Sequence, residues 1–302
     1  MVSLKPHPGA GIFFGLLAYL FFSSSDALIK ILSNKDSIES LSIYQIVATQ
    51  TLFGLIVILA LLPSRGGLSS LKIKSFKVFS ARALVAGLGA LFAYYSFSQM
   101  PMTEVYAIIF CTPMLVTILS VLFLKEIVKI YRWSAVVLGF IGVLIMVRPG
   151  FDTLTIAHLA ALCAACMGAS STLIMRKWGR FENPLAMLFS VMLGYLITSL
   201  PMVAFYYKTP SFNQWLMMAG SGFLLASAQF FIIKAIAITQ ASSIAPLQYS
   251  QMIWGLLFGL LIFKQTPDIY MLIGMIIIIG SSLYTLHREH IHGRTLNAQI
   301  KR

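Results

Sequence analysis

The residues that could do chemistry in this sequence are polar and charged side chains set inside long apolar runs. Asp26 and Lys30 lie four residues apart in the first run, so on a helix they share a face and could pair. A charged side chain is costly inside a bilayer, and one that is kept there often serves an ion, proton or substrate pathway. We therefore consider Asp26 as a proton-coupling or cation-binding carboxylate, with a stabilising ion pair to Lys30 as the alternative.

Arg82 and Lys234 are two further basic residues predicted to lie within helices. Both fall near the end of an apolar run, where a long side chain can bring its charge to the membrane surface. Lys234 also aligns with Tyr95 when the two halves of the chain are compared. A place on a cavity wall would let Lys234 contact an anionic group, so snorkelling and substrate binding both stay open for these residues.

Aromatic and amide side chains within apolar runs form a second set of candidates. They are Tyr94, Tyr95 and Gln99 in one run and Gln248, Tyr249, Gln251 and Trp254 in another. Such groups could bind a sugar, a nucleoside or an amino acid. The alternative is a place in the aromatic belts at the membrane surface, which suits tyrosines at the ends of runs better than Tyr249.

Pro113 and Pro246 are expected to interrupt two corresponding apolar runs. Proline removes a backbone donor and breaks or kinks a helix. Paired breaks in matching membrane helices free backbone groups to face a substrate cavity. Proline kinks without any ligand role are also common in membrane helices, so both interpretations are kept.

The elements that must position these residues are apolar segments long enough to cross a bilayer. The chain has 302 residues, 59% hydrophobic and 10% charged, whereas a soluble domain carries roughly 25% charged residues. We expect an all-α polytopic membrane protein with ten transmembrane helices. The ten segments are residues 9–32, 41–62, 78–99, 102–124, 130–147, 155–176, 184–207, 213–238, 241–263 and 268–287.

The net charge of +13 is assigned to membrane topology and not to nucleic-acid binding, because the basic residues fall mainly in short gaps between apolar runs. Fifteen of the 22 Lys and Arg residues lie in the terminal segments and the gaps on their side, four in the opposite gaps, and three within helices. Cytoplasmic loops carry the excess of Lys and Arg. Both termini, including a basic tail of residues 288–302, are therefore predicted in the cytoplasm of a bacterial cell, with the helices in the inner membrane.

The two halves of the chain, residues 9–148 and 155–287, resemble each other. Residues 95–126 and 234–265 share one order: a helix end, a short link, a proline-containing helix rich in small residues, and Lys followed by Glu or Gln. Each half would hold five helices, an odd number, so the second half must be inverted relative to the first. Inverted repeats are typical of alternating-access transporters.

Several stretches carry a resemblance to a known family. They are YYSFSQMP at 94–101, AIIFCTP at 107–113, LKE at 124–126, GFIGVLIMVRPG at 139–150, IAPLQY at 244–249 and PD at 267–268. With them the sequence resembles the EamA family of the drug/metabolite transporter superfamily. SSSD at 23–26, together with APxxY at 245–249 and FxxxPD at 263–268, is similar to bacterial carriers of this family that include S-adenosylmethionine uptake proteins.

The resemblance implies ten helices and transport of a small polar metabolite. It leaves cargo and direction open, because related EamA proteins export amino acids or import riboflavin. Gln265 stands where the family usually has Glu, so a structural and asymmetric role at that position is one implication.

The sequence contains no P-loop, HExxH, GxSxG or paired carboxylates, so ATP-driven transport by this chain alone and enzyme chemistry are not expected. No metal or cofactor is expected either. The predicted function is that of a secondary transporter moving a small polar metabolite, with protons or a counter-substrate to be tested as coupling partners. An amino-acid or drug exporter of the same family is the alternative, and an integral-membrane enzyme is the alternative from another class.

Overall fold

The structure is a computed structural model that describes residues 8–34, 40–61, 67–125, 130–148, 154–178, 181–238, 244–281 and 283–284. Within these ranges the chain forms helices and no strands. The predicted basic tail, residues 288–302, lies outside the described residues.

Seven helical spans in the described ranges are long and apolar enough to cross a membrane. Their helices are α1 (Pro8–Leu32), α2 (Ile43–Leu61), α3 (Phe76–Gln99), α4 (Met102–Ile109) continued by α5 (Thr112–Leu124), α7 (Ile156–Trp178), α8 (Pro184–Tyr206) and α9 (Phe212–Ile238). The remaining apolar helices are α6 (Ile130–Val147), α11 (Ser250–Leu261) and Ile269–Ser281. Every one of the ten predicted segments thus contains helix, and the prediction of an all-helical multi-pass membrane protein is confirmed.

The segment 102–124 is two helices, because Pro113 ends the first one. Proline has no N–H and its ring clashes with the carbonyl four residues earlier. That carbonyl belongs to Ile109, the last residue of α4. The hydroxyl of Thr112 donates to the Ile109 carbonyl at 2.5 Å and replaces the missing backbone donor. Phe110 and Cys111 lie in the turn between the two helices.

A similar change of helix occurs around Pro246. The short 3₁₀ helix η4 (Ala245–Tyr249) contains Pro246 and runs directly into α11. A short 3₁₀ helix within a longer helix often marks a functional hinge or strain. Both proline-containing segments thus depart from one continuous α-helix.

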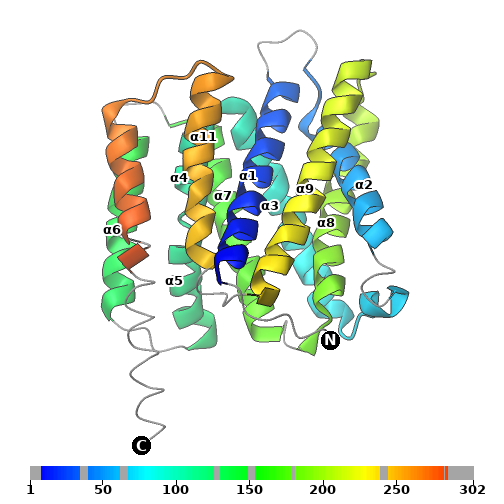
Figure 1. The fold of residues 1–302 in the computed structure, drawn as a ribbon, viewed down its shortest axis with the longest axis horizontal. Coiled ribbons are helices and arrows are strands. Elements are labelled where there is room, and N and C mark those ends of the chain that lie inside the picture. The colour runs from blue at the N-terminus through cyan, green and yellow to red at the C-terminus, as the bar shows by residue number, and fades with distance from the viewer. Residues whose placement is uncertain are drawn as a thin grey trace, which may run out of the picture.

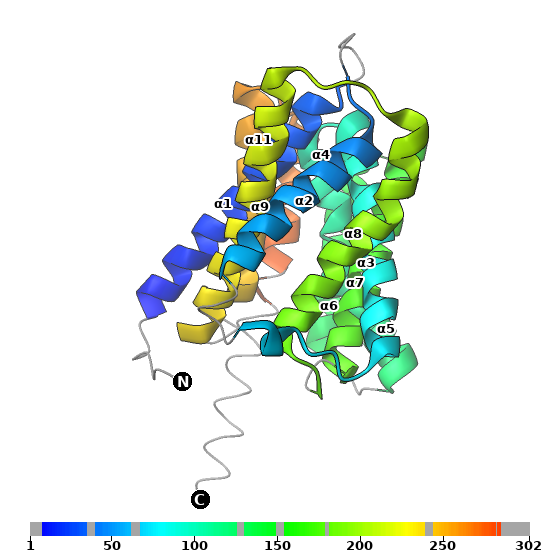
Figure 2. The ribbon, with the colours of Figure 1, turned by 90° about the vertical axis from the view of Figure 1, so that its right-hand side faces the viewer.

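The helices stand side by side in one bundle (Figure 1; Figure 2). α1 packs along α9, α3 packs between α7 and α8, α2 contacts α8 and α9, and α11 contacts α1 and α4. The end of the bundle at which α1 begins is called the lower end, as in Figure 1, and the end at which α1 finishes is called the upper end. The Ile269–Ser281 helix also finishes at the lower end.

Glycines allow the closest helix crossings, as is common in membrane bundles. A Cβ added to Gly194 of α8 would lie 1.8 Å from the carbonyl oxygen of Ala83 in α3. A Cβ added to Gly222 of α9 would lie 2.3 Å from the carbonyl oxygen of Gln50 in α2. At both crossings the two backbones therefore touch, and only glycine fits.

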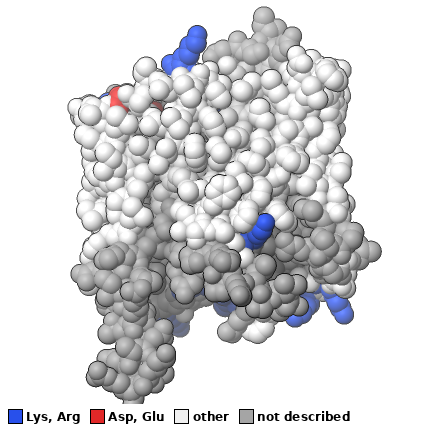
Figure 3. All heavy atoms as spheres, viewed as in Figure 1, with Lys and Arg blue, Asp and Glu red and all other residues white. Residues whose placement is uncertain are grey.

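The outer surface of the bundle is apolar over its middle. Figure 3 shows a broad band with little charge on the visible face and basic side chains gathered toward the lower end. Large apolar side chains are exposed on the outside, for example Ile56 at 62% and Ile197 at 62%. Such a surface suits contact with lipid chains and not with water.

Candidate functional site

Asp26 in α1 receives a hydrogen bond from a neighbouring helix. The hydroxyl of Tyr106 in α4 donates to Oδ2 of Asp26 at 2.7 Å, and Oγ of Ser23 lies 3.2 Å from the same hydroxyl oxygen. Tyr106 and Ser23 are buried, whereas Asp26 is partly accessible. The interior of the bundle therefore holds a carboxylate that has a stabilising partner and keeps some free surface.

A second set of hydrogen bonds joins four helices beside this pair. Nε2 of Gln50 in α2 donates to the hydroxyl of Tyr94 in α3 at 2.9 Å, and Ser221 in α9 donates to Oε1 of Gln50 at 2.5 Å. Ser25 in α1 donates to the carbonyl of Ser221 at 3.1 Å. Buried polar groups are stable when their hydrogen bonds are satisfied. This network fixes α1, α2, α3 and α9 relative to one another.

Aromatic rings extend from Tyr106 toward the second half of the chain. The ring of Tyr106 lies edge-on to Phe97, with centroids 5.2 Å apart, and stacks on Phe110 at 5.9 Å. Phe110, in the turn between α4 and α5, lies 5.3 Å from the ring of Tyr249 in η4. Rings beside a carboxylate can stack on a flat ligand or face a cation.

Lys30 has different partners from those the sequence predicted. Its Nζ donates to the carbonyl of Phe97 at 2.9 Å and to the carbonyl of Met100, at the end of α3. The last carbonyls of a helix lack partners within it and attract a cation. Asp26 bonds to Tyr106, so in place of the ion pair that the sequence left open as an alternative, the two side chains make separate interactions.

Tyr95 and Gln99 line a pocket of about 420 Å³ at the upper end of the bundle. Gln45 exchanges two hydrogen bonds, at 2.8 and 3.0 Å, with the backbone of Lys208, which lines the pocket. The pocket is lined by Ser33, Ser40, Leu41, Ser42, Ile43, Tyr95, Ser98, Gln99, Phe205, Tyr206, Tyr207 and Lys208. The structure thus separates Tyr95 and Gln99 from Tyr94, which belongs to the interior network.

Arg82 and Lys234 connect helices. Arg82 donates to the carbonyl of Met187 in α8 at 2.5 Å. Nζ of Lys234 lies 4.0 Å from the centre of the Phe14 ring in α1. Both charges are therefore engaged at helix contacts, and neither belongs to the hydrogen-bond networks around Asp26 and Gln50.

The candidates in the ninth segment lie where η4 passes into α11. Tyr249 is buried, and Gln248 and Gln251 are half-buried. Nε1 of Trp254 is buried without a hydrogen-bond partner among the described residues. A buried indole N–H usually finds a partner, so Trp254 is a donor still open to a ligand or water.

The sequence candidates omitted five members of the interior networks: Ser23, Ser25, Gln50, Tyr106 and Ser221. Gln50 carried the same signal as Gln99, an amide inside an apolar run. Tyr106 lies within a run just as Tyr94 does. Serine gives a weaker signal, since its hydroxyl often bonds to its own helix, as Ser24 does with the Leu20 carbonyl.

A bundle of apolar helices defines the class of multi-pass membrane proteins, and a hydrogen-bonded carboxylate inside it is typical of those that carry an ion, proton or substrate pathway. The model of the EamA-like transporter family matches residues 9–148 and 155–286. The chain belongs to this family.

Characterised relatives cover nearly the whole chain. It is 28% identical over 295 residues to a riboflavin transporter of Vibrio cholerae, covering 95% of this chain and 96% of that protein. It is 28% identical over 279 residues to an S-adenosylmethionine uptake transporter of Rickettsia conorii, covering 92% of this chain and 93% of that protein. The protein is thus a small-molecule transporter and not an enzyme.

The fold is also found among solved structures, for example in a crystal structure of a protein. It matches with a TM-score of 0.63 at 17% sequence identity and covers 92% of this chain and 96% of the other. At this identity the match supports the fold alone.

Proposed function

We propose that this protein is a secondary carrier that moves a small polar metabolite across the bacterial inner membrane by alternating access. The relatives are named for riboflavin and S-adenosylmethionine, and both compounds combine a heteroaromatic ring with a hydroxylated chain or sugar. A cargo of this kind, a nucleoside-type or amino-acid-type metabolite, suits the aromatic and hydroxyl groups of the interior.

The observation that carries this proposal is the hydrogen bond from Tyr106 to Asp26. It lies between α1 and α4, beside the turn at which α4 ends. A carboxylate kept inside a membrane bundle is a binding or coupling group by default. Asp26 would bind a proton or the cationic part of the cargo, while Tyr106 and Phe110 would contact its ring.

The proposed transport path lies between two inverted five-helix units, residues 9–148 and 155–287. Two features support this arrangement. The packing of α1 on α9 has its counterpart in the packing of α7 on α3. Lys125 directly follows α5 and Lys264 lies three residues beyond the end of α11. The two lysines occupy matching positions of the repeat, and both have a left-handed backbone with φ of 53°.

Both termini are proposed to lie in the cytoplasm. The lower end of the bundle would then face the cytoplasm and the upper end, with the pocket around Tyr95, the outside. Arg148, Lys208 and Lys264 are among the few basic residues assigned outside, which agrees with the excess of Lys and Arg expected on the cytoplasmic side.

Counterflow in proteoliposomes tests the function without assuming a direction. Vesicles loaded with unlabelled riboflavin, S-adenosylmethionine, nucleosides or amino acids would be diluted into a trace of the same labelled compound. We expect one compound class to accumulate transiently in vesicles with the protein and not in protein-free vesicles. If no compound in the panel shows counterflow or moves down an imposed gradient, while a known carrier reconstituted in parallel does, the carrier proposal fails.

A further inference from the structure

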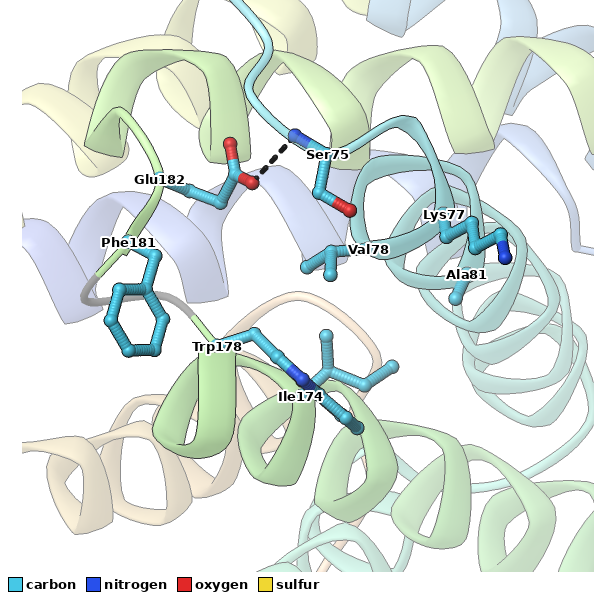
Figure 4. A pocket seen from close by; sticks show the side chains of 8 residues that line it. All are labelled: Ser75, Lys77, Val78, Ala81, Ile174, Trp178, Phe181 and Glu182. Atoms are coloured by element: carbon cyan, nitrogen blue, oxygen red, sulfur yellow. Dashed lines mark hydrogen bonds between the residues drawn. The ribbon is translucent and has the colours of Figure 1, made fainter.

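A pocket of about 460 Å³ lies at the lower end of the bundle, apart from the interior site. It opens between the start of α3 and the end of α7, as Figure 4 shows. Val78 and Ala81 of α3 form one wall, and Ile174 and Trp178 of α7 form the other. From Ser75 to Ala81 the lining extends roughly 9 Å along the start of α3, and Val78 and Ala81 form its apolar part.

Two lysines from different helices lie at this pocket or against a residue that lines it. Lys77 of α3 lines it directly. Nζ of Lys177 in α7 lies 4.7 Å from the ring of Trp178, which is itself part of the lining. Both lysines are exposed. An apolar pocket with a cationic rim at the end of the membrane span matches a lipid with an anionic headgroup.

Glu182 also lines the pocket, and its carboxylate is held by backbone donors at the start of α3. Its Oε1 accepts from the backbone N–H of Ser75 at 2.8 Å, and its Oε2 accepts from that of Lys74 at 3.1 Å. The carboxylate thus serves the start of α3, where an acidic group is favourable. Among the described residues, no salt bridge joins Glu182 to Lys77 or Lys177.

We propose that this pocket binds an anionic phospholipid, with the phosphate between Lys77 and Lys177 and an acyl chain against Val78, Ala81 and Ile174. Trp178 and the exposed Phe181 would lie at the level of the headgroup, where aromatic side chains are favoured. The inference does not depend on the identity of the cargo. It applies to whichever membrane leaflet contains the lower end.

Thermal unfolding of the full-length protein in dodecyl maltoside tests the proposal. Dioleoylphosphatidylglycerol should raise the melting temperature by about 3 to 8 °C more than dioleoylphosphatidylcholine, and native mass spectrometry should show the phosphatidylglycerol retained. The variant Lys77→Gln/Lys177→Gln should lose this difference. Lys77→Arg/Lys177→Arg should keep it, which separates loss of charge from loss of folding.

A control variant removes the same charge elsewhere. Lys72→Gln/Lys125→Gln changes two lysines at the lower end that do not line the pocket, and it should keep the preference for phosphatidylglycerol. Ala81→Phe should block the acyl chain and lower the retention of lipid with both lysines intact. The proposal would be overturned if the two lipids raised the melting temperature of the unaltered protein equally. It would also be overturned if the control variant lost the preference for phosphatidylglycerol as fully as Lys77→Gln/Lys177→Gln.

Discussion

Asp26 and Tyr106 belong to helices that are remote in sequence, and their hydrogen bond of 2.7 Å brings a titratable group into the bundle. Hydrogen bonds to charged groups contribute about 1.5–3 kcal/mol. If Asp26 took up a proton, its carboxyl group could itself donate a hydrogen bond, which would change its interaction with the Tyr106 hydroxyl. Protonation of Asp26 would therefore affect the contact between α1 and α4.

Replacing Asp26 by Asn tests the coupling role. Asn keeps the size and can still accept from Tyr106, but it cannot take up a proton. We expect Asp26→Asn to reduce uptake driven by an imposed pH gradient in proteoliposomes about tenfold or more, while counterflow of the cargo persists if the residue only couples. Ser24→Ala is the matched control, since the Ser24 hydroxyl bonds within α1. Unchanged pH dependence in the Asn variant would remove Asp26 from coupling.

The sequence identified Asp26 and Tyr94 as candidates but not their partners. Polarity within an apolar run can be seen in the sequence, whereas the choice of partner depends on how helices remote in sequence pack. Lys30 illustrates the difference, because its spacing from Asp26 favoured a pair within α1. The carbonyls of Phe97 and Met100 bind Lys30 instead, and their position required the end of α3 to be known.

At the scale of elements, the glycine crossings determine how closely helices approach. α3 and α8 touch through Ala83 and Gly194, and α2 and α9 touch through Gln50 and Gly222. Close approach strengthens packing in a membrane, where the hydrophobic effect does not drive helices together. These crossings hold the helices that carry the interior polar network.

Gly194→Ala should destabilise the protein by about 1–3 kcal/mol. The added methyl would lie 1.8 Å from the Ala83 carbonyl, and a backbone atom cannot rotate aside as a side chain can. Melting temperature in detergent measures the effect. Gly280→Ala is the control, because a Cβ there meets nothing within 4 Å. An equal response of the two variants would contradict the close crossing.

The sequence predicted the helical segments well because their apolar runs are long and clearly interrupted. It placed proline in the two segments that change helix, but not the residue at which the first helix ends. The end at Ile109 follows from the reach of the Pro113 ring and from the Thr112 hydroxyl. These are local steric details that a hydropathy pattern does not contain.

For the whole molecule, the proposed orientation can be tested by labelling. Single cysteines would be introduced at Ser69 and Lys208, at opposite ends of the bundle, after replacement of Cys111, Cys163 and Cys166. A membrane-impermeant maleimide applied to spheroplasts should label Lys208→Cys directly. Ser69→Cys should react only after permeabilisation. The reverse pattern would place the termini outside.

The packing of α1 on α9 also has a consequence for biosynthesis. α1 ends at Leu32 and α9 begins at Phe212, so at about 5–20 residues per second α1 is complete roughly 10 to 40 s before its main partner exists. In the first part of that interval, until α3 and α4 have been made, Asp26 and Lys30 must enter the membrane without the contacts that later hold them. The insertion machinery or nearby water must solvate these polar groups during that time. The packing of the first half of the chain is complete only after α9 has been synthesised.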